Sequence, residues 1–533
     1  MAKKNITYEV SMEKIEEFVN RKGRFFRRPD FSRLRDPDYR GYVIRRTVVY
    51  IFLTLFCIAF LAIMSASTSP LFVDYCDGDS SIFMLIGKAI SMGKNVYTDY
   101  FDHKGPILFY LNALGFYMTG SKTGVFIIQC VFLSLTSIFM YKTARIFAKT
   151  FASIICVIVT LLAFASTISD GNLNEEYCML FCMIPIYLSI KHITKNPDTP
   201  HPKRYMFVYG VCFAACAFIR INNGIMIGGI VLVTLVTDFI SENIKEAFLN
   251  VLMFILGILA AAVPICLFFL IKGTLSDMIF ATFTFNFMYA SEGSAEKNSG
   301  AMSELLLWVL PVLVIIFIST VFSKRLGAKV ASLITTISVF ALIPILLGFS
   351  YTHYYTTLIP LIVIYSAVFF FLAGKRITFW SVILCIAMIL PLSGYFKSLP
   401  QNISHYAQKA YEQSKELPDK DSRSKIYKSV TALSKHIPDD ERNSVFGYDL
   451  SSAWFLQADI MPCYRLFTLQ ESWSSCYPTF GREINQMMIG TPPKWLIVHN
   501  IDIIQSRQLR NIINTDYTLI AEYDYDLLFK HND

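Results

Sequence analysis

The sequence predicts an α-helical polytopic membrane protein with a small extracytoplasmic α/β domain at its carboxy-terminal end. Hydrophobic residues make up 54% of the 533 positions, and the mean hydropathy is +0.47. Long apolar runs recur from residue 46 to residue 394 and then cease. A soluble fold cannot bury that much apolar surface, so the composition excludes an ordinary soluble enzyme.

The apolar runs are long enough for about eleven transmembrane helices. A helix needs roughly 20 apolar residues to cross about 30 Å of hydrocarbon. No trustworthy cleavage site follows the first run, so we expect it to be an uncleaved anchor. The runs define a transmembrane domain over 46–394, and they are 46–66, 122–141, 151–168, 177–190, 205–219, 224–240, 250–271, 303–322, 330–348, 356–373 and 377–394.

The distribution of Lys and Arg predicts the orientation in the membrane. The amino-terminal arm, 1–45, is rich in Arg and Lys, and basic residues are retained on the cytoplasmic side. The same bias recurs at 142–149, 191–204, 324–329 and 375–376. The segments between these clusters are therefore expected to face outward, and they are 67–121, 169–176, 219–223, 272–302, 349–355 and 395–533.

The net charge and the amino-terminal arm bear on partners and location. The positive-inside excess beside anionic lipid accounts for the net charge of +8, so the charge does not require a nucleic-acid partner. The arm is compact and carries no endoplasmic-reticulum signal. We therefore expect a bacterial plasma membrane, with a cytoplasmic amino terminus and an extracytoplasmic carboxy-terminal domain.

The first outer loop, 67–121, contains the most informative polar stretch of the chain. Residues 74–106 read DYCDGDSSIFMLIGKAISMGKNVYTDYFDHKGP. Apolar residues at three-and-four spacing over 82–90 predict an amphipathic helix along the membrane surface, ending near Gly93. Asp79 stands where this helix begins. It is therefore either a helix N-cap or, together with Asp77, a reactive carboxylate.

The second half of this stretch crowds ionisable residues before another apolar run. Asp99, Asp102, His103 and Lys104 precede Gly105 and Pro106, and the apolar run follows at 107–118. A solvated loop can contain such residues by chance. The alternative is a reaction centre at the membrane surface.

Three further polar points interrupt apolar sequence on the same predicted side. Ionisable residues at membrane depth are costly and usually pair or serve function. Taken singly, each point has a simpler interpretation, such as solvation, a headgroup contact or an interfacial position. Their convergence on one side favours a site. The residues are Asn172, Asn174, Glu175 and Glu176, then Arg220, Asn222 and Asn223, and finally Tyr351, His353, Tyr354 and Tyr355.

The order of these motifs resembles the GT-C superfamily of membrane glycosyltransferases, on the branch of the protein O-mannosyltransferases and the lipid A aminoarabinose transferase. The resemblance covers roughly residues 45–395. It rests on Asp77-Gly78-Asp79, on Lys104-Gly105-Pro106, and on His353-Tyr354-Tyr355 before Pro360. The chain departs from better-known members in having Asp-Gly-Asp instead of adjacent Asp-Glu, and Gly-Pro instead of Pro-Pro after the Lys. The form of the motifs is similar to an uncharacterised bacterial subgroup.

The resemblance implies transfer of a sugar from a polyprenyl-phosphate donor to an acceptor hydroxyl, outside the membrane and with inversion. Such a reaction needs a carboxylate as general base and cations or donors for the departing phosphate. Asp79 is the expected base, with Asp77 as the other choice. The expected phosphate-binding residues are Lys104, Arg220 and His353. The expected substrate-binding residues are Asp99, Asp102, His103, Glu175, Glu176, Asn222 and Tyr354.

We expect no obligatory cofactor. No nucleotide-sugar site is visible in the sequence, and no His, Cys and Asp set has metal-ligand spacing. Asp77 and Asp79 are the oxygen ligands that can hold Mg²⁺ or Mn²⁺ if the enzyme uses one. The expected partners are the lipid-linked donor, membrane lipids and a cell-envelope glycan, lipid or protein as acceptor.

The carboxy-terminal part, 395–533, is charged and mixed in composition. Strand-like runs at 443–448, 494–499 and 517–523 alternate with helical stretches at 482–488 and 504–513, which predicts a small α/β domain. Its aromatic residues, which include Trp454, Trp473, Tyr477 and Trp495, either form its core or line a carbohydrate surface. Cys463 and Cys476 lie in the same region, and sequence alone leaves a disulfide between them open.

Two other classes of protein fit parts of the sequence. A flippase or transporter of lipid-linked sugars places polar residues near the bilayer midplane, often within internal repeats. Here the polar residues lie at span ends, and the chain shows no convincing repeat. A non-catalytic subunit of an envelope-assembly complex needs the fold without the acids and their basic partners. Substitution of Asp79 separates these possibilities from an enzyme.

Overall fold

The computed structural model describes residues 36–289, 301–347, 351–374, 399–413 and 423–532. Contacts divide the chain into two compact units, Met1–Phe56 and Cys57–Asp533. The described part of the first unit is helical from Pro37, where α2 (Pro37–Met64) begins. The Asp36 carboxylate accepts a hydrogen bond from the Asp38 N–H at 2.9 Å, which satisfies one amide of the first turn. Most of the basic arm and the run at 377–394 lie outside the described residues.

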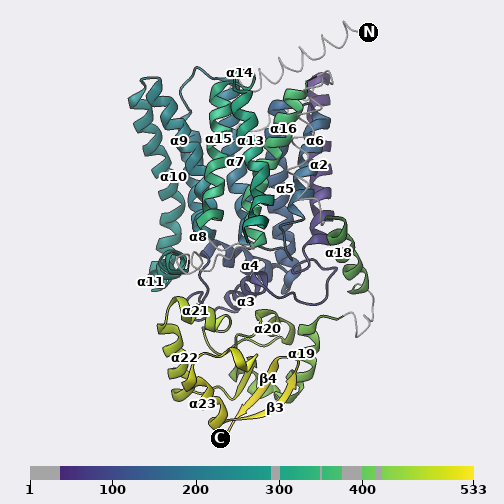
Figure 1. Ribbon diagram of the computed structural model, residues 1–533, viewed down its shortest axis with the longest axis vertical. Helices are drawn as coiled ribbons and strands as arrows, with labels where there is room; N and C mark the ends of the chain where they lie inside the picture. Colours follow the sequence, from purple (N-terminus) through teal and green to yellow (C-terminus); the bar gives the residue numbers. More distant parts are fainter. Residues whose placement is uncertain (1–35, 290–300, 348–350, 375–398, 414–422, 533) are drawn as a thin grey trace. The chain divides into compact units, whose positions relative to one another are not determined.

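Long apolar helices make up most of the chain before residue 375, and the predicted fold class is confirmed (Figure 1). Within the described ranges, seven segments are long and apolar enough to cross a membrane. The α6 helix and the described end of α13 are shorter apolar helices. The apolar helices after α2 are α5 (Lys122–Phe147), α6 (Thr150–Phe164), α7 (Asn174–Lys195), α8 (Lys203–Arg220), α9 (Ile225–Ile240), α10 (Ile244–Ile271), α13 (Ala301–Val321), α15 (Ala328–Leu347) and α16 (Ile359–Ala373).

One of the seven apolar segments, Lys203–Ile240, contains both α8 and α9. The chain turns back between them at η2 (Ile221–Gly224). A Cβ added to Gly224 would lie 3.3 Å from Cys216 Cβ, so the turn folds onto α8. His201, just before α8, and Thr237, near the end of α9, line one cavity. This segment therefore forms two antiparallel helices, as the two predicted spans require. The total of eleven spans stays a prediction.

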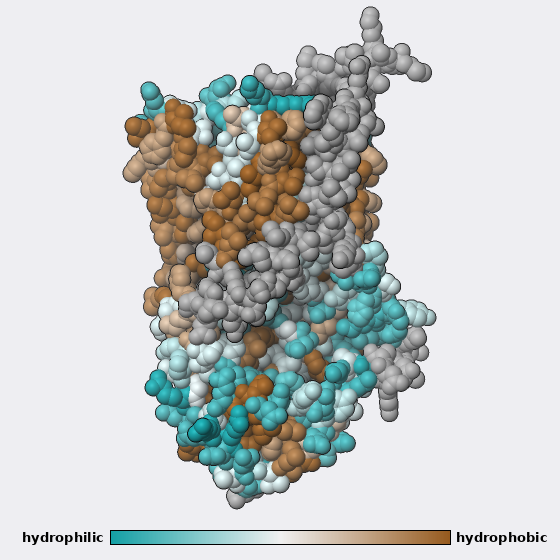
Figure 2. All heavy atoms as spheres, in the orientation of Figure 1, coloured by the Kyte–Doolittle hydropathy of each residue, from teal (hydrophilic) through white to brown (hydrophobic). Residues whose placement is uncertain are grey.

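The outward faces of the helices are strongly apolar. Phe248, Ile271 and Phe317 are 69%, 85% and 67% exposed, and apolar residues gather over the helical segments while hydrophilic residues cover the carboxy-terminal domain (Figure 2). Apolar faces of this extent are stable in hydrocarbon and not in water. The protein is therefore a membrane protein.

The first outer loop forms two short helices, α3 (Asp79–Ser91) and α4 (Pro106–Thr119). The predicted ending near Gly93 is confirmed, since Gly93 has φ +88°. The expected position along the membrane surface stays a prediction, and in the structure α3 packs against α4 and against α20 (Ser452–Ala458). The packing against α4 is close: a Cβ on Gly87 would lie 2.6 Å from Asn112 Cβ on α4.

The carboxy-terminal part contains a four-stranded sheet in the order β1-β2-β4-β3. The β1 and β2 strands are parallel, and the other two pairs are antiparallel. The three predicted strand runs and the α/β alternation are confirmed, whereas β4 was missed because Asp526 and Lys530 weaken its apolar pattern. The elements are α18 (Leu399–Gln413), α19 (Lys425–Leu433), β1 (Val445–Tyr448), α20, α21 (Gln470–Cys476), α22 (Thr479–Gly490), β2 (Trp495–His499), α23 (Arg507–Asp516), β3 (Tyr517–Tyr523) and β4 (Asp526–His531).

The aromatic residues of this domain belong mainly to its core. Trp454, Trp473 and Trp495 are 1%, 1% and 3% exposed, so the three Trp side chains form no open carbohydrate surface. Tyr477 packs against Phe280 with ring centroids 5.3 Å apart. Cys463 is a free thiol, so it forms no disulfide with Cys476.

A buried ion pair joins the first outer loop to the segment before α19. The Asp74 carboxylate accepts a hydrogen bond from Arg423 Nε at 2.7 Å and another from the Ser424 N–H at 2.6 Å. Lys122 Nζ donates to the Asp74 carbonyl at 2.9 Å. Asp74 is only 2% exposed, and three residues later the chain reaches Asp77. This pair therefore fixes the start of the acidic motif.

We expect Asp74→Asn to destabilise the protein by about 3 kcal/mol, because Arg423 then keeps a buried charge without its partner. The measurement is the thermal unfolding midpoint in detergent, together with hydrogen exchange of the amides at 73–75. Asp439→Asn is the matched control. Asp439 is 92% exposed where it pairs with Arg442, so its loss should cost less than about 1 kcal/mol. Equal midpoints for the two variants would contradict this account.

Candidate active site

Backbone geometry at Gly78 sets the position of Asp79. Gly78 is the N-cap of α3, with φ 99°, ψ −171° and no side-chain hydrogen bond, a conformation that is essentially restricted to glycine. Asp79 is the first residue of the helix, so its interpretation as the N-cap is wrong. Asp77 instead accepts hydrogen bonds from the Gly78 N–H, at 2.7 Å, and from the Ser451 hydroxyl. The two acids of the motif therefore have different surroundings.

Two cations, Lys104 and Arg220, and the imidazole of His353 lie around the Asp79 carboxylate. His353 Nε2 lies 4.0 Å from Asp79 Oδ2, and the Asp79 side chain is 32% exposed. Burial favours the neutral acid, but the charges of Lys104, His353 and Arg220 outweigh it and lower the pKa of Asp79. Asp79 is consequently an ionised carboxylate at neutral pH.

Lys104 is held beside the end of α8 by a close backbone contact at Gly105. The Gly105 N–H donates to the Ile219 carbonyl at 2.8 Å, and a Cβ at this position would lie 2.1 Å from the Phe218 carbonyl oxygen. Proline, which lacks the N–H, cannot make this contact. The departure from a Lys-Pro-Pro motif thus has a physical reason. Lys104 itself is 6% exposed.

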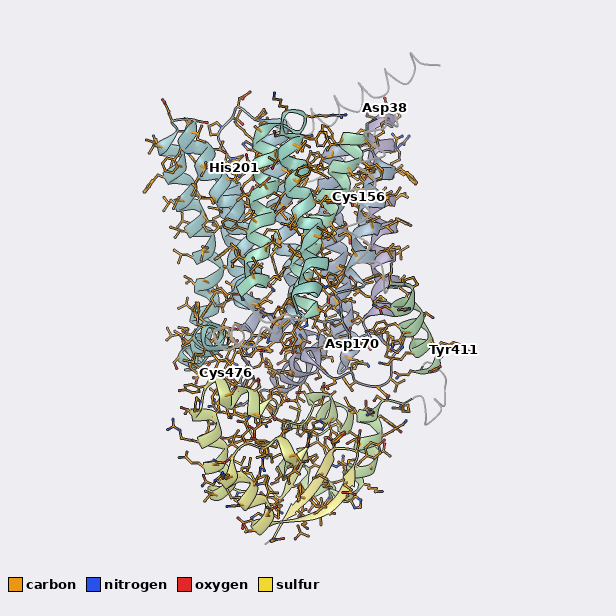
Figure 3. All side chains as sticks on the ribbon, in the orientation of Figure 1. Asp38, Cys156, Asp170, His201, Tyr411 and Cys476 are labelled. Atoms are coloured by element: carbon orange, nitrogen blue, oxygen red, sulfur yellow. The ribbon has the colours of Figure 1, made fainter. Side chains whose placement is uncertain are left out.

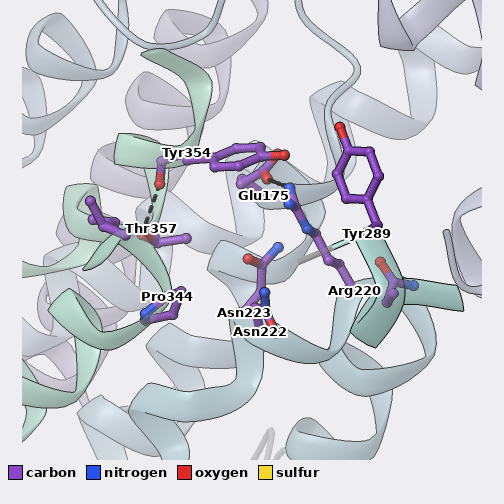
Figure 4. Close-up of a pocket in the computed structure, with 10 residues that line it drawn as sticks. Glu175, Arg220, Asn222, Asn223, Tyr289, Pro344, Tyr354 and Thr357 are labelled. Atoms are coloured by element: carbon purple, nitrogen blue, oxygen red, sulfur yellow. Dashed lines mark hydrogen bonds and ion pairs between the residues drawn. The ribbon is translucent and has the colours of Figure 1, made fainter. Parts of the chain in front are cut away.

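Arg220 ends α8 and pairs with Glu175 at the start of α7. Its Nη1 lies 2.7 Å from Glu175 Oε1, and its guanidinium lies 4.0 Å from the centroid of the Tyr354 ring. Figure 4 shows this arrangement, with Asn222, Asn223 and Tyr289 beside it. An ion pair and a ring together hold the guanidinium plane in one orientation.

These side chains surround a small cavity of about 30 Å³, lined by Glu175, Arg220, Asn222, Asn223, Asn286, Tyr289, Pro344, Ile345, Tyr354 and Thr357. Several buried polar atoms here have no hydrogen-bond partner among the described residues. Glu175 Oε2 belongs to the cavity wall, and His353 Nε2 and Asn174 Nδ2 belong to residues adjacent in sequence to wall residues. An unsatisfied buried polar atom costs about 1–3 kcal/mol. Such atoms are expected where a polar ligand completes the site.

His103 and Asp102 also lie close to Lys104, as the sequence predicts. His103 Nε2 is 2.8 Å from Lys104 Nζ, and burial together with the charges of Lys104 and Arg220 lowers the pKa of His103 well below its usual value. His103 is therefore a neutral acceptor. Burial raises the pKa of Asp102, and its Oδ1 accepts the Lys104 N–H at 2.8 Å.

Two of the predicted substrate-binding acids have other neighbours. Glu176 accepts hydrogen bonds from Gln129 Nε2, at 2.9 and 3.1 Å, and from the Asn172 N–H. Asp99 lies at the surface and accepts the Asn95 N–H at 2.8 Å. Neither lines the cavity, so their substrate-binding role stays a prediction.

Three residues of the cavity wall, Asn286, Tyr289 and Thr357, were not predicted from the sequence. Asn286 donates from Nδ2 to the His103 carbonyl at 2.6 Å, and the Tyr289 ring lies 4.7 Å from the His103 ring. Both follow a turn of π-helix at η3 (Phe280–Thr284), which is common at functional sites. Their place in an outward-facing segment was the one available signal, because neither residue is ionised at neutral pH.

A divalent cation fits poorly beside Asp79. Lys104, His353 and Arg220 face its carboxylate, and no group of three metal-ligating side chains occurs in the part of the chain that the structure describes. The Asp77 oxygen already accepts two hydrogen bonds. A metal at Asp77 would have to displace these hydrogen bonds, and a metal at Asp79 would lie beside positive charges.

Comparisons with known proteins agree with this fold. A family model described as the competence-induced protein Ccs4 N-terminal domain matches residues 43–378. The structure of ArnT from Cupriavidus metallidurans, bound to undecaprenyl phosphate, is similar at 12% identity and a TM-score of 0.55, covering 92% of this chain and 98% of that one. No curated protein matches in sequence.

A second solved structure is also similar. It is the oligosaccharyltransferase AglB from Archaeoglobus fulgidus with an inhibitory peptide and a dolichol-phosphate, at 13% identity and a TM-score of 0.49. The match covers 85% of this chain and 69% of that chain. The chain has the GT-C membrane glycosyltransferase fold, on the likeness to ArnT.

We expect Gly105→Ala to lower the thermal unfolding midpoint by the equivalent of about 1–3 kcal/mol, because the added methyl group must push the loop away from α8. The midpoint is measured in detergent. Gly490→Ala is the matched control, since nothing lies within 4 Å of a Cβ added there. If both variants unfold at the wild-type temperature, Gly105 does not hold Lys104 in place.

Proposed function

The chain belongs to the family of competence-induced Ccs4 N-terminal domains, and we propose that it is a membrane glycosyltransferase that uses a polyprenyl-phosphate-linked sugar. The observation that carries the proposal is the ionised Asp79 facing Lys104, His353 and Arg220. A carboxylate and a group of cations are what such a transfer needs: a base for the acceptor and a site for the phosphate that leaves. The ArnT structure, which holds undecaprenyl phosphate, supports a lipid-linked donor.

The donor phosphate binds at the cations in this proposal. Arg220 offers a planar guanidinium held by Glu175 and Tyr354, which suits a phosphate group. Lys104 adds a second positive charge, and His353 offers an imidazole N–H to the phosphate. A polyprenyl chain can stay in the hydrocarbon while its headgroup meets residues at the helix ends.

The reaction is a single displacement with inversion at the anomeric carbon. The acceptor oxygen attacks this carbon, its proton passes to Asp79, and the bond to the phosphate oxygen breaks. The leaving phosphate takes the bonding electrons, and the cations stabilise its charge. Because Lys104 and Arg220 already supply positive charge for the leaving phosphate, we propose that transfer needs no divalent cation.

Donor binding also prepares the base. Without a donor, the cations hold the pKa of Asp79 below its ordinary value, which makes it a weak base. A bound phosphate neutralises part of this charge, so the carboxylate becomes more basic just when an acceptor is to be deprotonated.

We place the enzyme in a bacterial plasma membrane, with the site on the extracytoplasmic side and a cell-envelope glycan, lipid or protein as acceptor. The positive-inside distribution supports this orientation. The ionised residues of the site lie at the ends of α7 and α8 and at the start of α3. A transporter would need them near the midplane.

Substitution of Asp79 tests its role as the base. Asp79→Asn should reduce transfer of labelled sugar, from a panel of polyprenyl-phosphate sugars to cell-envelope fractions, by about 10²–10⁴-fold. Wild-type and variant membranes are compared with and without EDTA, and EDTA should have no effect. Asp516→Asn, at an exposed position in α23, is the matched control.

Each other outcome identifies an error. Equal transfer by wild type and Asp79→Asn would move the base to Asp77. Loss of transfer in EDTA would show that the enzyme needs a divalent cation. No transfer with any donor, accompanied by movement of lipid-linked sugar across vesicles, would favour a flippase, and the absence of both activities would favour a non-catalytic subunit.

The pH dependence of transfer tests the effect of Lys104 on Asp79. Because the charge of Lys104 lowers the pKa of Asp79, Lys104→Gln should raise that pKa and move the acidic limb of kcat/KM toward neutral pH. The sign follows from the lost cation: the carboxylate is less stabilised and binds its proton at higher pH. Lys88→Gln, which removes an exposed pair with Asp459, should leave the limb in place. An unchanged limb in Lys104→Gln would show that Asp79 is not the titrating base.

A further inference from the structure

A second cavity opens on the other side of the acidic motif. It measures about 360 Å³ and is bounded by Asp77 and Asp79 on one side and by residues of the carboxy-terminal domain on the other. This volume is within the range typical of small-molecule sites, about 300–1,000 Å³. Asp79 therefore borders this cavity while its carboxylate also faces the cations of the active site.

The charge of this cavity is opposite to that of the cation cluster. Five carboxylates line it, those of Asp77, Asp79, Asp449, Asp524 and Asp526, together with Lys425 and His499. Lys425 pairs with Asp524, and His499 pairs with Asp526 at 2.7 Å. The hydrogen bond that His499 donates to Asp526, together with the charges of Asp526, Asp77 and Asp449, raises the pKa of His499. All of these acids therefore act on one side chain of the cavity wall. The cavity is negative overall.

Groups other than the acids indicate a ligand. Ser452 lines the cavity and is 1% exposed, yet its hydroxyl has no hydrogen-bond partner among the described residues. Tyr525, also in the wall, is 61% exposed. An open aromatic ring beside carboxylates and hydroxyls is suited to a sugar, whose C–H face packs on the ring while its hydroxyls donate to the acids.

The acceptor must approach Asp79 from a side that the donor does not occupy. If the phosphate takes the side of Lys104, Arg220 and His353, the acidic cavity is a separate approach that borders this carboxylate. Phosphate or carboxylate groups on an acceptor would meet like charges there, at a cost, whereas ammonium groups and hydroxyls would be attracted or neutral.

We propose that this cavity binds the acceptor, and that the acceptor is a saccharide whose groups near the reacting hydroxyl are hydroxyls and amines, not phosphates or carboxylates. The proposal rests on the proposed function, because it takes Asp79 as the base. It narrows the acceptor from envelope polymers in general to uncharged or amine-bearing glycans. Teichoic-acid-like polyphosphates are excluded at this position.

The test measures binding to the full-length protein in lipid nanodiscs by calorimetry. Three probes are compared: a glucosamine tetramer, its fully N-acetylated form and a short polyglycerol phosphate. The glucosamine tetramer should bind most tightly. The N-acetylated tetramer should bind more weakly by a factor of at most about 5, and binding of the polyphosphate should not be measurable. The advantage of the amine should shrink as salt is raised.

Two variants tie binding to the cavity. Asp449 and Asp524 have φ of 48° and 53°, a region that Asn tolerates about as well as Asp, so Asn should leave the backbone unchanged. Asp449→Asn and Asp524→Asn should each weaken binding of the glucosamine tetramer by up to about 5-fold. Asp440→Asn, at an exposed position outside the cavity, should not.

The outcomes separate this proposal from the proposed function. Equal or tighter binding of the polyphosphate, or glucosamine binding that neither cavity variant weakens, would overturn the acceptor site even if transfer depends on Asp79. Charge-selective binding that both variants weaken would support the saccharide site. If the protein shows the same binding but transfers no sugar from any donor, the proposed glycosyltransferase function is wrong and the saccharide site stands.

Discussion

The cost of burying cations governs the arrangement of this protein. Lys104 is 6% exposed and Arg220 has a side chain only 10% exposed, so each needs a partner to offset its desolvation. Glu175 supplies one for Arg220, and the Asp79 carboxylate lies within the field of both cations. This requirement explains why the starts of α3 and α7 and the end of α8 meet at one place. It also leaves a field ready for an anion.

Two glycines make this meeting of charges possible. Gly78 adopts a positive φ that directs Asp79 to the start of α3, and Gly105 lets the loop touch the α8 backbone. The second contact puts Lys104 near Arg220 without any direct bond between them. Because the contact between Gly105 and α8 fixes the backbone, Lys104 and Arg220 cannot easily move apart to relieve their repulsion. Such preorganisation is what electrostatic stabilisation of a leaving group requires.

Hydropathy and charge were enough to predict the fold class, with its long apolar helices and its small α/β domain. They were not enough to distinguish neighbours such as Glu175 and Glu176. Consecutive residues on a helix point about 100° apart, and here one meets Arg220 while the other meets Gln129. The same limit applies to Asp79, whose place in the first turn depends on a backbone angle at Gly78. The His201 cavity at the other end of α8, remote from Asp170 (Figure 3), likewise depends on the turn at η2.

The two sides of Asp79 have opposite charge, and this asymmetry suggests an order of events. With the cations unoccupied, their field keeps the Asp79 proton affinity low, and an acceptor bound early would meet a poor base. A donor phosphate reduces that field first. With less positive charge beside it, the carboxylate binds a proton more readily. In the proposed mechanism, Asp79 is therefore the stronger base when the donor binds before the acceptor.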